Sequence, residues 1–294
     1  MFGSVRIKSA PAVICFLLCT MLAAAVCCLK SPSIKHMPVN AEIAEKQTCD
    51  VPIIMYHAVS DIPEIQGDYV ISPAELESDL KYLAENSYSF VFVKDLVDFV
   101  NGNTALPEKS IVLSFDDGYY NNYLYAYPLL KKYNANASLS PIAYYSELYT
   151  QNGEVNESYT HCTWEMLTEM CDSGLVELGN HSYNLHVYDN VQQGVGQKRG
   201  ESDDEYKARI TEDISKAQRM IEENTGRHCD FIAYPFGIYN SLTEDIAQKL
   251  GFKAALTCNS GINHLEQGIT DSVYELKRLI RPHNSGIENI LKQE

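Results

Sequence analysis

Segments with the pattern of β-strands alternate with helix-like segments along most of the chain, and this alternation limits the fold more than any other feature. The apolar runs at 51–59 and 110–118, for example, are each followed by a helix-like segment, at 72–90 and 121–134. Because strand–helix–strand repetition places parallel strands beneath covering helices, the chain is predicted to have an α/β fold. About seven such units in roughly 240 residues indicate a barrel or near-barrel, although the pattern alone also allows an open doubly wound sheet.

Local signals mark several helix boundaries and one long connection. Ser72 and Glu75 have the spacing of a capping box, and Gly251 stands where a glycine commonly follows the end of a helix. The segment from His186 to Glu205 contains three glycines and little apolar periodicity. It is therefore predicted to be a surface loop.

The first 29 residues have the pattern of a targeting segment. Arg6 and Lys8 are its only charged residues, and the stretch Pro11–Leu29 has none. Its length suits either a cleaved signal peptide or a retained membrane anchor, since about 20 residues span a bilayer. Lipidation at Cys27 or Cys28 is a weaker alternative, because the preceding residues match a lipobox poorly. We therefore predict a targeting segment at 1–29, a linker at 30–50 and one domain at 51–294.

This organisation predicts an extracytoplasmic protein, secreted or held at the outer face of the cytoplasmic membrane, with membrane contact only through the N-terminal segment. The net charge is -16, and the acids are distributed along the chain. Nucleic acid is an improbable partner, because binding phosphates requires a basic surface. The oligomeric state stays open.

Five cysteines lie beyond the targeting segment. Their number is odd, and their spacing matches neither a disulfide framework nor a zinc finger. We expect buried, unreactive thiols and leave any pairing open. These residues are Cys49, Cys162, Cys171, Cys229 and Cys258.

Two adjacent acids, Asp116 and Asp117, end the apolar run that begins at 110. Parallel α/β folds build their sites at the carboxyl ends of strands, and adjacent carboxylates there point in different directions. One can bind a metal ion while the other handles a proton, as metal-assisted hydrolysis requires. Asp-Asp-Gly is also a common turn, so the pair alone leaves both interpretations open.

Two histidines, His181 and His186, follow another strand-like run that begins at 176. Five positions apart, they do not share a helix face, but an irregular turn after a strand can direct both imidazoles at one ion. Together with the acidic pair at the end of another strand, they favour a metal site over two isolated histidines.

Three segments, at 114–118, 180–186 and 233–237, resemble in order and separation the motifs of NodB-type polysaccharide deacetylases, carbohydrate esterase family 4. The resemblance extends from about Val51 to the C-terminus. It is closest to the branch that deacetylates poly-β-1,6-N-acetylglucosamine, in which four residues also separate the two histidines. It implies that the fold is a distorted (β/α)7 barrel.

The resemblance also implies the chemical roles of five residues. Asp117, His181 and His186 match the three metal ligands. Asp116 matches the general base. His57 matches the general acid, which this branch takes from an early strand, and an imidazole suits that role because it titrates near neutral pH.

The third motif implies that the backbone N–H of Phe236 donates to the reacting carbonyl oxygen. The family usually has Arg where this chain has Ala233, and that Arg orients the catalytic Asp by an ion pair; Arg278 is the candidate to orient Asp116 instead. The family's Asp-Trp motif is missing, since Trp164, the only tryptophan, begins an ordinary amphipathic helix at 163–174.

Sugars are commonly bound against aromatic faces, and several of the 20 tyrosines lie close in sequence to the proposed site. Most of them are expected to be packing residues. Tyr145 is predicted to contact substrate. The tyrosines near the site strands are Tyr119, Tyr120, Tyr123, Tyr144 and Tyr145.

The resulting hypothesis is a hydrolase that removes N-acetyl groups from an N-acetylglucosamine-containing polysaccharide and releases acetate. Zinc is the expected cofactor, with cobalt or manganese as alternatives. A second reading is an impaired carbohydrate-binding module on the same fold, and a third is a deacetylase of another glycan such as xylan. The polymer itself stays open, because loops determine such specificity.

Overall fold

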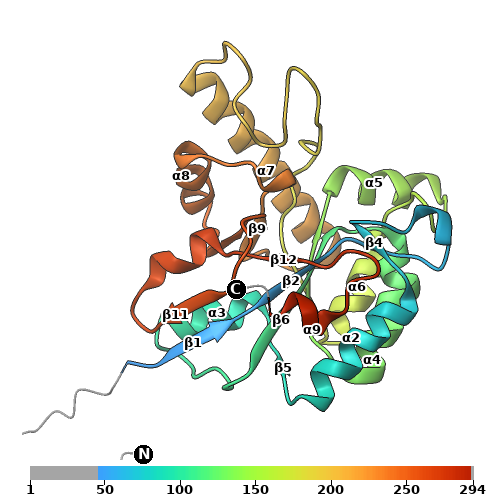
Figure 1. Ribbon diagram of the computed structural model, residues 1–294. Helices are drawn as coiled ribbons and strands as arrows, with labels where there is room; N and C mark the ends of the chain where they lie inside the picture. Colours follow the sequence, from blue (N-terminus) through green and yellow to red (C-terminus); the bar gives the residue numbers. More distant parts are fainter. Residues whose placement is uncertain (1–45, 293–294) are drawn as a thin grey trace, which may run out of the picture. The chain divides into compact units, whose positions relative to one another are not determined.

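The computed structural model describes residues 46–292 (Figure 1). The predicted targeting segment and most of the predicted linker lie outside the described residues. Among residues 46–292, no helix is both long enough and apolar enough to span a bilayer.

A parallel sheet organises the domain, and its strands follow one another in the order β12-β2-β6-β7-β8. β9 and β10 pair in parallel as a second sheet. A single bridge joins Asn180 to Ile232 of β9, and another joins Leu256 of β10 to Leu276, shortly before β12. These strands are β2 (Ile53–Tyr56), β6 (Ser110–Asp117), β7 (Ala137–Pro141), β8 (Val176–Leu178), β9 (Phe231–Ala233), β10 (Ala254–Leu256) and β12 (Leu279–Ile280).

The predicted barrel of seven parallel strands is thus confirmed as a barrel-like arrangement. Within the described residues, however, single bridges take the place of continuous ladders at two positions, so the barrel is not closed. This is the distortion that the family resemblance implied.

Helices cover the sheet, and the predicted capping signals are confirmed. Ser72 and Glu75 form a capping box at the start of α2, and Gly251 follows the C-cap of α8 with a φ of 92°. Trp164 begins α6, as predicted. The helices are α2 (Pro73–Glu85), α3 (Val93–Val100), α4 (Tyr127–Tyr133), α5 (Ala143–Asn152), α6 (Trp164–Asp172), α7 (Asp203–Thr225), α8 (Ser241–Lys249) and α9 (Ile287–Ile290).

The two faces of the strands serve different parts of the core, because successive side chains of a strand alternate. The outer face, which carries Ile54, Leu113 and Leu139, packs with α2, α4, α6 and α7. The inner face carries Ile53 and Val112, which pack with α3. Further along β6 the inner face becomes polar, with Ser114 and then Asp116. Because side chains alternate along β6, Ser114 and Asp116 both lie on the inner face, near the carboxyl end of the sheet.

The N-terminal strand β1 (Thr48–Val51) pairs antiparallel with β11 (Asn263–Glu266). This pairing was not predicted, and it begins three residues before the predicted start of the domain at Val51. Three short strands, β3 (Ala58–Val59), β4 (Val70–Ile71) and β5 (Ser89–Phe90), complete the sheets.

The segment predicted as a surface loop at 186–205 differs from that prediction in two respects. Its last residues belong to α7, which begins at Asp203. Val195 is fully buried, and its carbonyl accepts a hydrogen bond of 2.8 Å from the Tyr206 hydroxyl. Arg209 of α7 also donates to the Gly196 carbonyl at 2.9 Å. The loop is therefore attached to the helix that follows it.

Glu177 of β8 carries a buried carboxyl group on the inner face, and its effect on the stability of the fold can be tested. Its carboxylate accepts hydrogen bonds from the backbone N–H of Val93 (2.6 Å) and the Ser138 hydroxyl (2.5 Å), and burial raises its pKa to about 7. The folded chain therefore binds this proton more tightly than the unfolded chain, and stability is lost as the pH rises from about 4.5 through about 7. Glu177→Gln is expected to gain roughly 2–3 kcal/mol over wild type across this window.

Urea unfolding of both proteins at a series of pH values would measure the difference. Glu223→Gln, an exposed position on α7, is the matched control and is expected to follow wild type. If the difference in the free energy of unfolding between Glu177→Gln and wild type did not change with pH, the raised pKa of Glu177 would not be its cause.

Candidate active site

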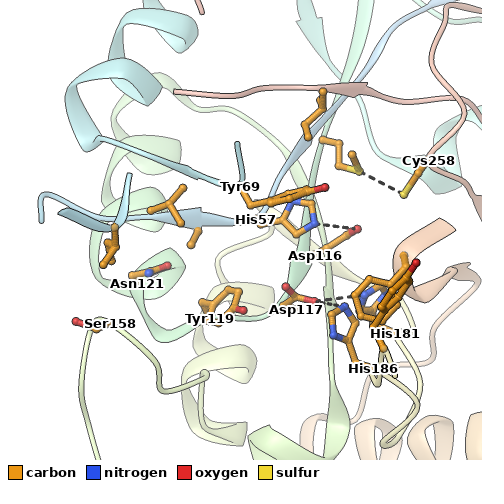
Figure 2. Close-up of a pocket in the computed structure, with 17 residues that line it drawn as sticks. His57, Tyr69, Asp116, Asp117, Tyr119, Asn121, Ser158, His181, His186 and Cys258 are labelled. Atoms are coloured by element: carbon orange, nitrogen blue, oxygen red, sulfur yellow. Dashed lines mark hydrogen bonds and ion pairs between the residues drawn. The ribbon is translucent and has the colours of Figure 1, made fainter. Parts of the chain in front are cut away.

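A cavity of about 690 Å³ lies at the carboxyl ends of the parallel strands (Figure 2). It receives His57 after β2, Asp116 and Asp117 at the end of β6, and His181 and His186 after β8. Parallel strands end on the same rim of a barrel, which brings these distant segments together.

The backbone at the end of β6 directs both acids into this cavity. Strand alternation would send Asp116 and Asp117 to opposite faces. Asp117, however, has a φ of 68°, and Gly118 follows with a φ of 73°. A Cβ atom on Gly118 would lie 2.8 Å from the Cβ of Pro141, so only glycine fits beside β7. This left-handed turn gives the cavity two consecutive carboxylates.

Asp117 lies between the two predicted histidines. Its Oδ1 is 3.4 Å from Nε2 of His181 and 3.3 Å from Nε2 of His186, and the three groups form a cluster with ligand atoms within 4.8 Å of one another. Nδ1 of His181 is 2.8 Å from the carbonyl oxygen of Ala233, which leaves Nε2 for the cluster. A histidine held in this way is characteristic of metal sites.

The electrostatics of the cluster suit a cation. Oδ1 of Asp117 is buried and has no hydrogen-bond partner among the described residues. Although burial opposes it, the neighbouring histidines hold the pKa of Asp117 well below its usual range. Burial lowers the pKa of His186, which favours the neutral imidazole that binds metals. One carboxylate and two imidazoles therefore fit a divalent ion.

Asp116 forms a buried ion pair with Arg278. Nη1 of Arg278 donates to Oδ1 of Asp116 at 2.7 Å, and Nε donates to the carbonyl oxygen of Thr257 at 2.7 Å. Arg278 is only 1% exposed. Burial raises the pKa of Asp116, but the charges of Arg278, His181 and His57 outweigh it and lower the pKa overall. Asp116 is therefore held as a carboxylate in one orientation.

His57 lies on the other side of Asp116, with 4.0 Å between its Nε2 and Oδ2 of the carboxylate. Burial lowers the pKa of His57, although Asp116 and Asp117 act in the opposite direction. The Tyr69 ring packs edge-on against the imidazole, 4.8 Å between centroids. Figure 2 shows His57 facing Asp116, while Asp117 faces His181 and His186.

Phe236 lines the cavity from the short 3-10 helix Pro235–Gly237, with a φ of 57°. Its ring lies 4.1 Å from that of His186. Tyr145 does not line the cavity: it stacks on His161 at 4.5 Å, and His161 packs against Tyr119, which does line it. A role for Tyr145 in binding substrate stays a prediction.

The expectation that the five cysteines are buried is wrong for Cys258, which is exposed and lines the cavity, and Cys49 is only partly buried. It is correct for Cys162, Cys171 and Cys229. Tyr69 and Tyr188 also line the cavity and were not predicted. They lie on irregular segments, and neither periodicity nor a motif distinguishes them.

A family model described as polysaccharide deacetylase matches residues 103–255, which is just over half of the chain. The chain belongs to the polysaccharide deacetylase family. The match includes the turn with both acids, the two histidines and the Phe236 segment, whereas His57 and Arg278 lie outside the matched residues.

This deacetylase spans well under half of one similar protein and most of another. The poly-beta-1,6-N-acetyl-D-glucosamine N-deacetylase of Escherichia coli K12 is 26% identical over 258 residues, which cover 82% of this chain but only 38% of that protein. A putative polysaccharide deacetylase of Bacillus subtilis, YxkH, is 26% identical over 86% of this chain and 79% of its own length.

Among solved structures, a de-N-acetylase from Aggregatibacter actinomycetemcomitans superimposes with a TM-score of 0.70 and 28% identity. The comparison covers 82% of this chain and 98% of that one. The similarity therefore includes the strands that carry the cavity.

Proposed function

We propose that this protein is a zinc-dependent deacetylase that removes N-acetyl groups from a poly-N-acetylglucosamine-type glycan outside the cytoplasm. The observation that carries the proposal is the meeting of Asp117, His181 and His186 beside the Asp116–Arg278 pair in one cavity. The names of the Escherichia coli and Aggregatibacter proteins support N-deacetylation as the reaction.

Asp117, His181 and His186 would hold the cation. A zinc ion bound there would supply positive charge that favours ionisation of a water molecule and polarises the acetamide carbonyl. Cobalt and manganese also suit this ligand set, and zinc is our choice because two imidazoles and one carboxylate match its preferences.

Asp116 would act as the general base. The ion pair with Arg278 keeps it ionised and fixes its orientation, so that it can accept a proton from the attacking water. Arg278 thereby takes the place of the arginine that the family usually has at the position of Ala233, where no charged side chain is available.

His57 would protonate the departing amine. Because burial favours its neutral form, His57 needs a proton during the reaction, and Asp116 is the neighbour that has just received one. Nε2 of His57 would take that proton from Asp116 and donate it to the amine nitrogen, while the electron pair of the negative oxygen re-forms the carbonyl bond of acetate and the C–N bond breaks. The backbone N–H of Phe236 would stabilise the negative oxygen of the tetrahedral intermediate.

The predicted N-terminal targeting segment supports action on a polymer outside the cytoplasmic membrane. The test is acetate release from purified protein with a panel of glycans: β-1,6- and β-1,4-linked N-acetylglucosamine oligomers, peptidoglycan and acetylated xylan. We expect release from the β-1,6-linked oligomers, its loss with a chelator, and its return with added zinc. Release from xylan alone, or release that a chelator does not affect, would contradict the proposal.

A further inference from the structure

Two exposed tyrosines stand at opposite ends of the row of residues that forms the site. Tyr69 is 56% exposed and packs on His57, and His57 in turn faces Asp116. Asp117 follows and contacts His186. His57, Asp116, Asp117 and His186 therefore form a row that begins beside Tyr69.

At that other end, His186 packs on Phe236, and the Phe236 ring lies 5.3 Å from that of Tyr188. Tyr188 is 65% exposed. Tyrosine has an apolar ring and a polar hydroxyl, and it is enriched at binding surfaces for this reason. Both tyrosines line the cavity and belong to segments that the fold holds in place.

Both tyrosines lie on backbone segments that contact neighbouring parts of the fold. The carbonyl oxygen of Tyr69 accepts a hydrogen bond of 3.0 Å from Ala58, next to the pairing of β3 with β4. Tyr188 forms an antiparallel bridge with Gln193, and a Cβ atom on the neighbouring Gly194 would lie only 2.6 Å from the carbonyl oxygen of Pro235. Rigid aromatic rings bind ligands with little loss of side-chain entropy.

The charge around the cavity discriminates between glycans. Among its described lining residues there is no lysine or arginine, while Asp68 and Asp189, adjacent in sequence to the two tyrosines, are exposed. A glycan with carboxylates or phosphates would find no cation among these lining residues and would meet the negative charge of Asp68 beside Tyr69, whereas Lys198 partly offsets the charge of Asp189 at the other end. An uncharged chain would not meet this repulsion.

We propose that Tyr69 and Tyr188 are stacking platforms for the sugars on either side of the reacting one, and that the substrate is an internal unit of an uncharged N-acetylhexosamine chain. This inference rests on the proposed deacetylase function. A cavity of 690 Å³ is in the range that encloses a drug-sized ligand, which is larger than one sugar. The reacting acetamide lies over the metal ligands, and its neighbours contact the two rings.

The experiment is isothermal titration calorimetry and acetate-release kinetics with a β-1,6-linked N-acetylglucosamine hexamer. Tyr69→Ala and Tyr188→Ala are each expected to weaken binding and raise KM by about 3- to 10-fold, with a smaller effect on kcat. Tyr69→Phe and Tyr188→Phe keep the ring and are expected to restore wild-type binding. A hexamer that alternates N-acetylglucosamine with carboxylate-bearing N-acetylmuramic acid is expected to bind more weakly than the neutral one.

Tyr159→Ala is the matched control, because Tyr159 is 49% exposed and does not line the cavity. The inference is overturned if the alanine variants bind the neutral hexamer like wild type, if the phenylalanine variants fail to restore binding, or if the anionic hexamer binds more tightly. Failure of the proposed function has a different signature: wild type would release no acetate from any glycan, while calorimetry would still report on the two tyrosines.

Discussion

His181→Ala is expected to lose zinc and to lower acetate release by at least about 10²–10³-fold. His181 contributes one of three proposed ligands and is oriented by the carbonyl oxygen of Ala233, so its removal leaves only Asp117 and His186 of the cluster. The ion's charge supplies several kcal/mol of transition-state stabilisation, and each 1.36 kcal/mol is a factor of ten. Zinc content of the purified variant and its rate of acetate release would be measured together.

His228→Ala is the control for this variant, because His228 is exposed and distant in sequence from the cluster. It is expected to retain both zinc and activity. If His181→Ala kept one zinc per chain and the wild-type rate, the assignment of the three ligands would be wrong.

Asp116→Asn is expected to lower kcat by about 10²–10⁴-fold, which is the range for removal of a general base. The amide still accepts a hydrogen bond from Arg278 but cannot take the proton of the attacking water. Zinc content should not change, because Asp117 and the two histidines remain. Rate and zinc content are measured on the same preparation.

The combination of results distinguishes a base from a ligand. A slow variant with full zinc supports Asp116 as the base, and a slow variant without zinc indicates that Asp116 helps to bind the ion. Acetate release at the wild-type rate would refute the assigned role.

The class of fold was predictable because it follows from local patterns. Strand-like and helix-like runs, the Ser72 capping box and Gly251 are all encoded within a few residues, and each appears where predicted. The antiparallel pairing of β1 with β11 was not predicted, because it joins residues more than 200 positions apart and no local pattern encodes the partner. The single bridges at Asn180 and Leu256 were not predictable either, because they also depend on long-range packing.

In the site, too, residues in local motifs were predictable, whereas positions that depend on long-range packing were not. The acids and histidines lie in compact motifs, and the structure brings Asp117, His181 and His186 together. Arg278 was proposed only because an arginine was missing at Ala233 and another lay near the last strand; it pairs with Asp116. The positions of Tyr69 and Cys258 depend on irregular segments, whose paths cannot be derived from periodicity.

The ion pair between Asp116 and Arg278 joins residues 162 positions apart. Every proposed ligand of the ion, and Phe236, precedes Arg278 in the chain. During synthesis, the polypeptide thus acquires its histidines and acids well before the cation that holds Asp116. In a chain that ends before Arg278, only His181 and His57 would oppose the burial that raises the pKa of Asp116, so we expect its pKa to be higher and the carboxylate to be a weaker candidate base. We therefore expect a chain truncated before Arg278 to have little or no hydrolytic activity, even though it contains every proposed ligand of the ion.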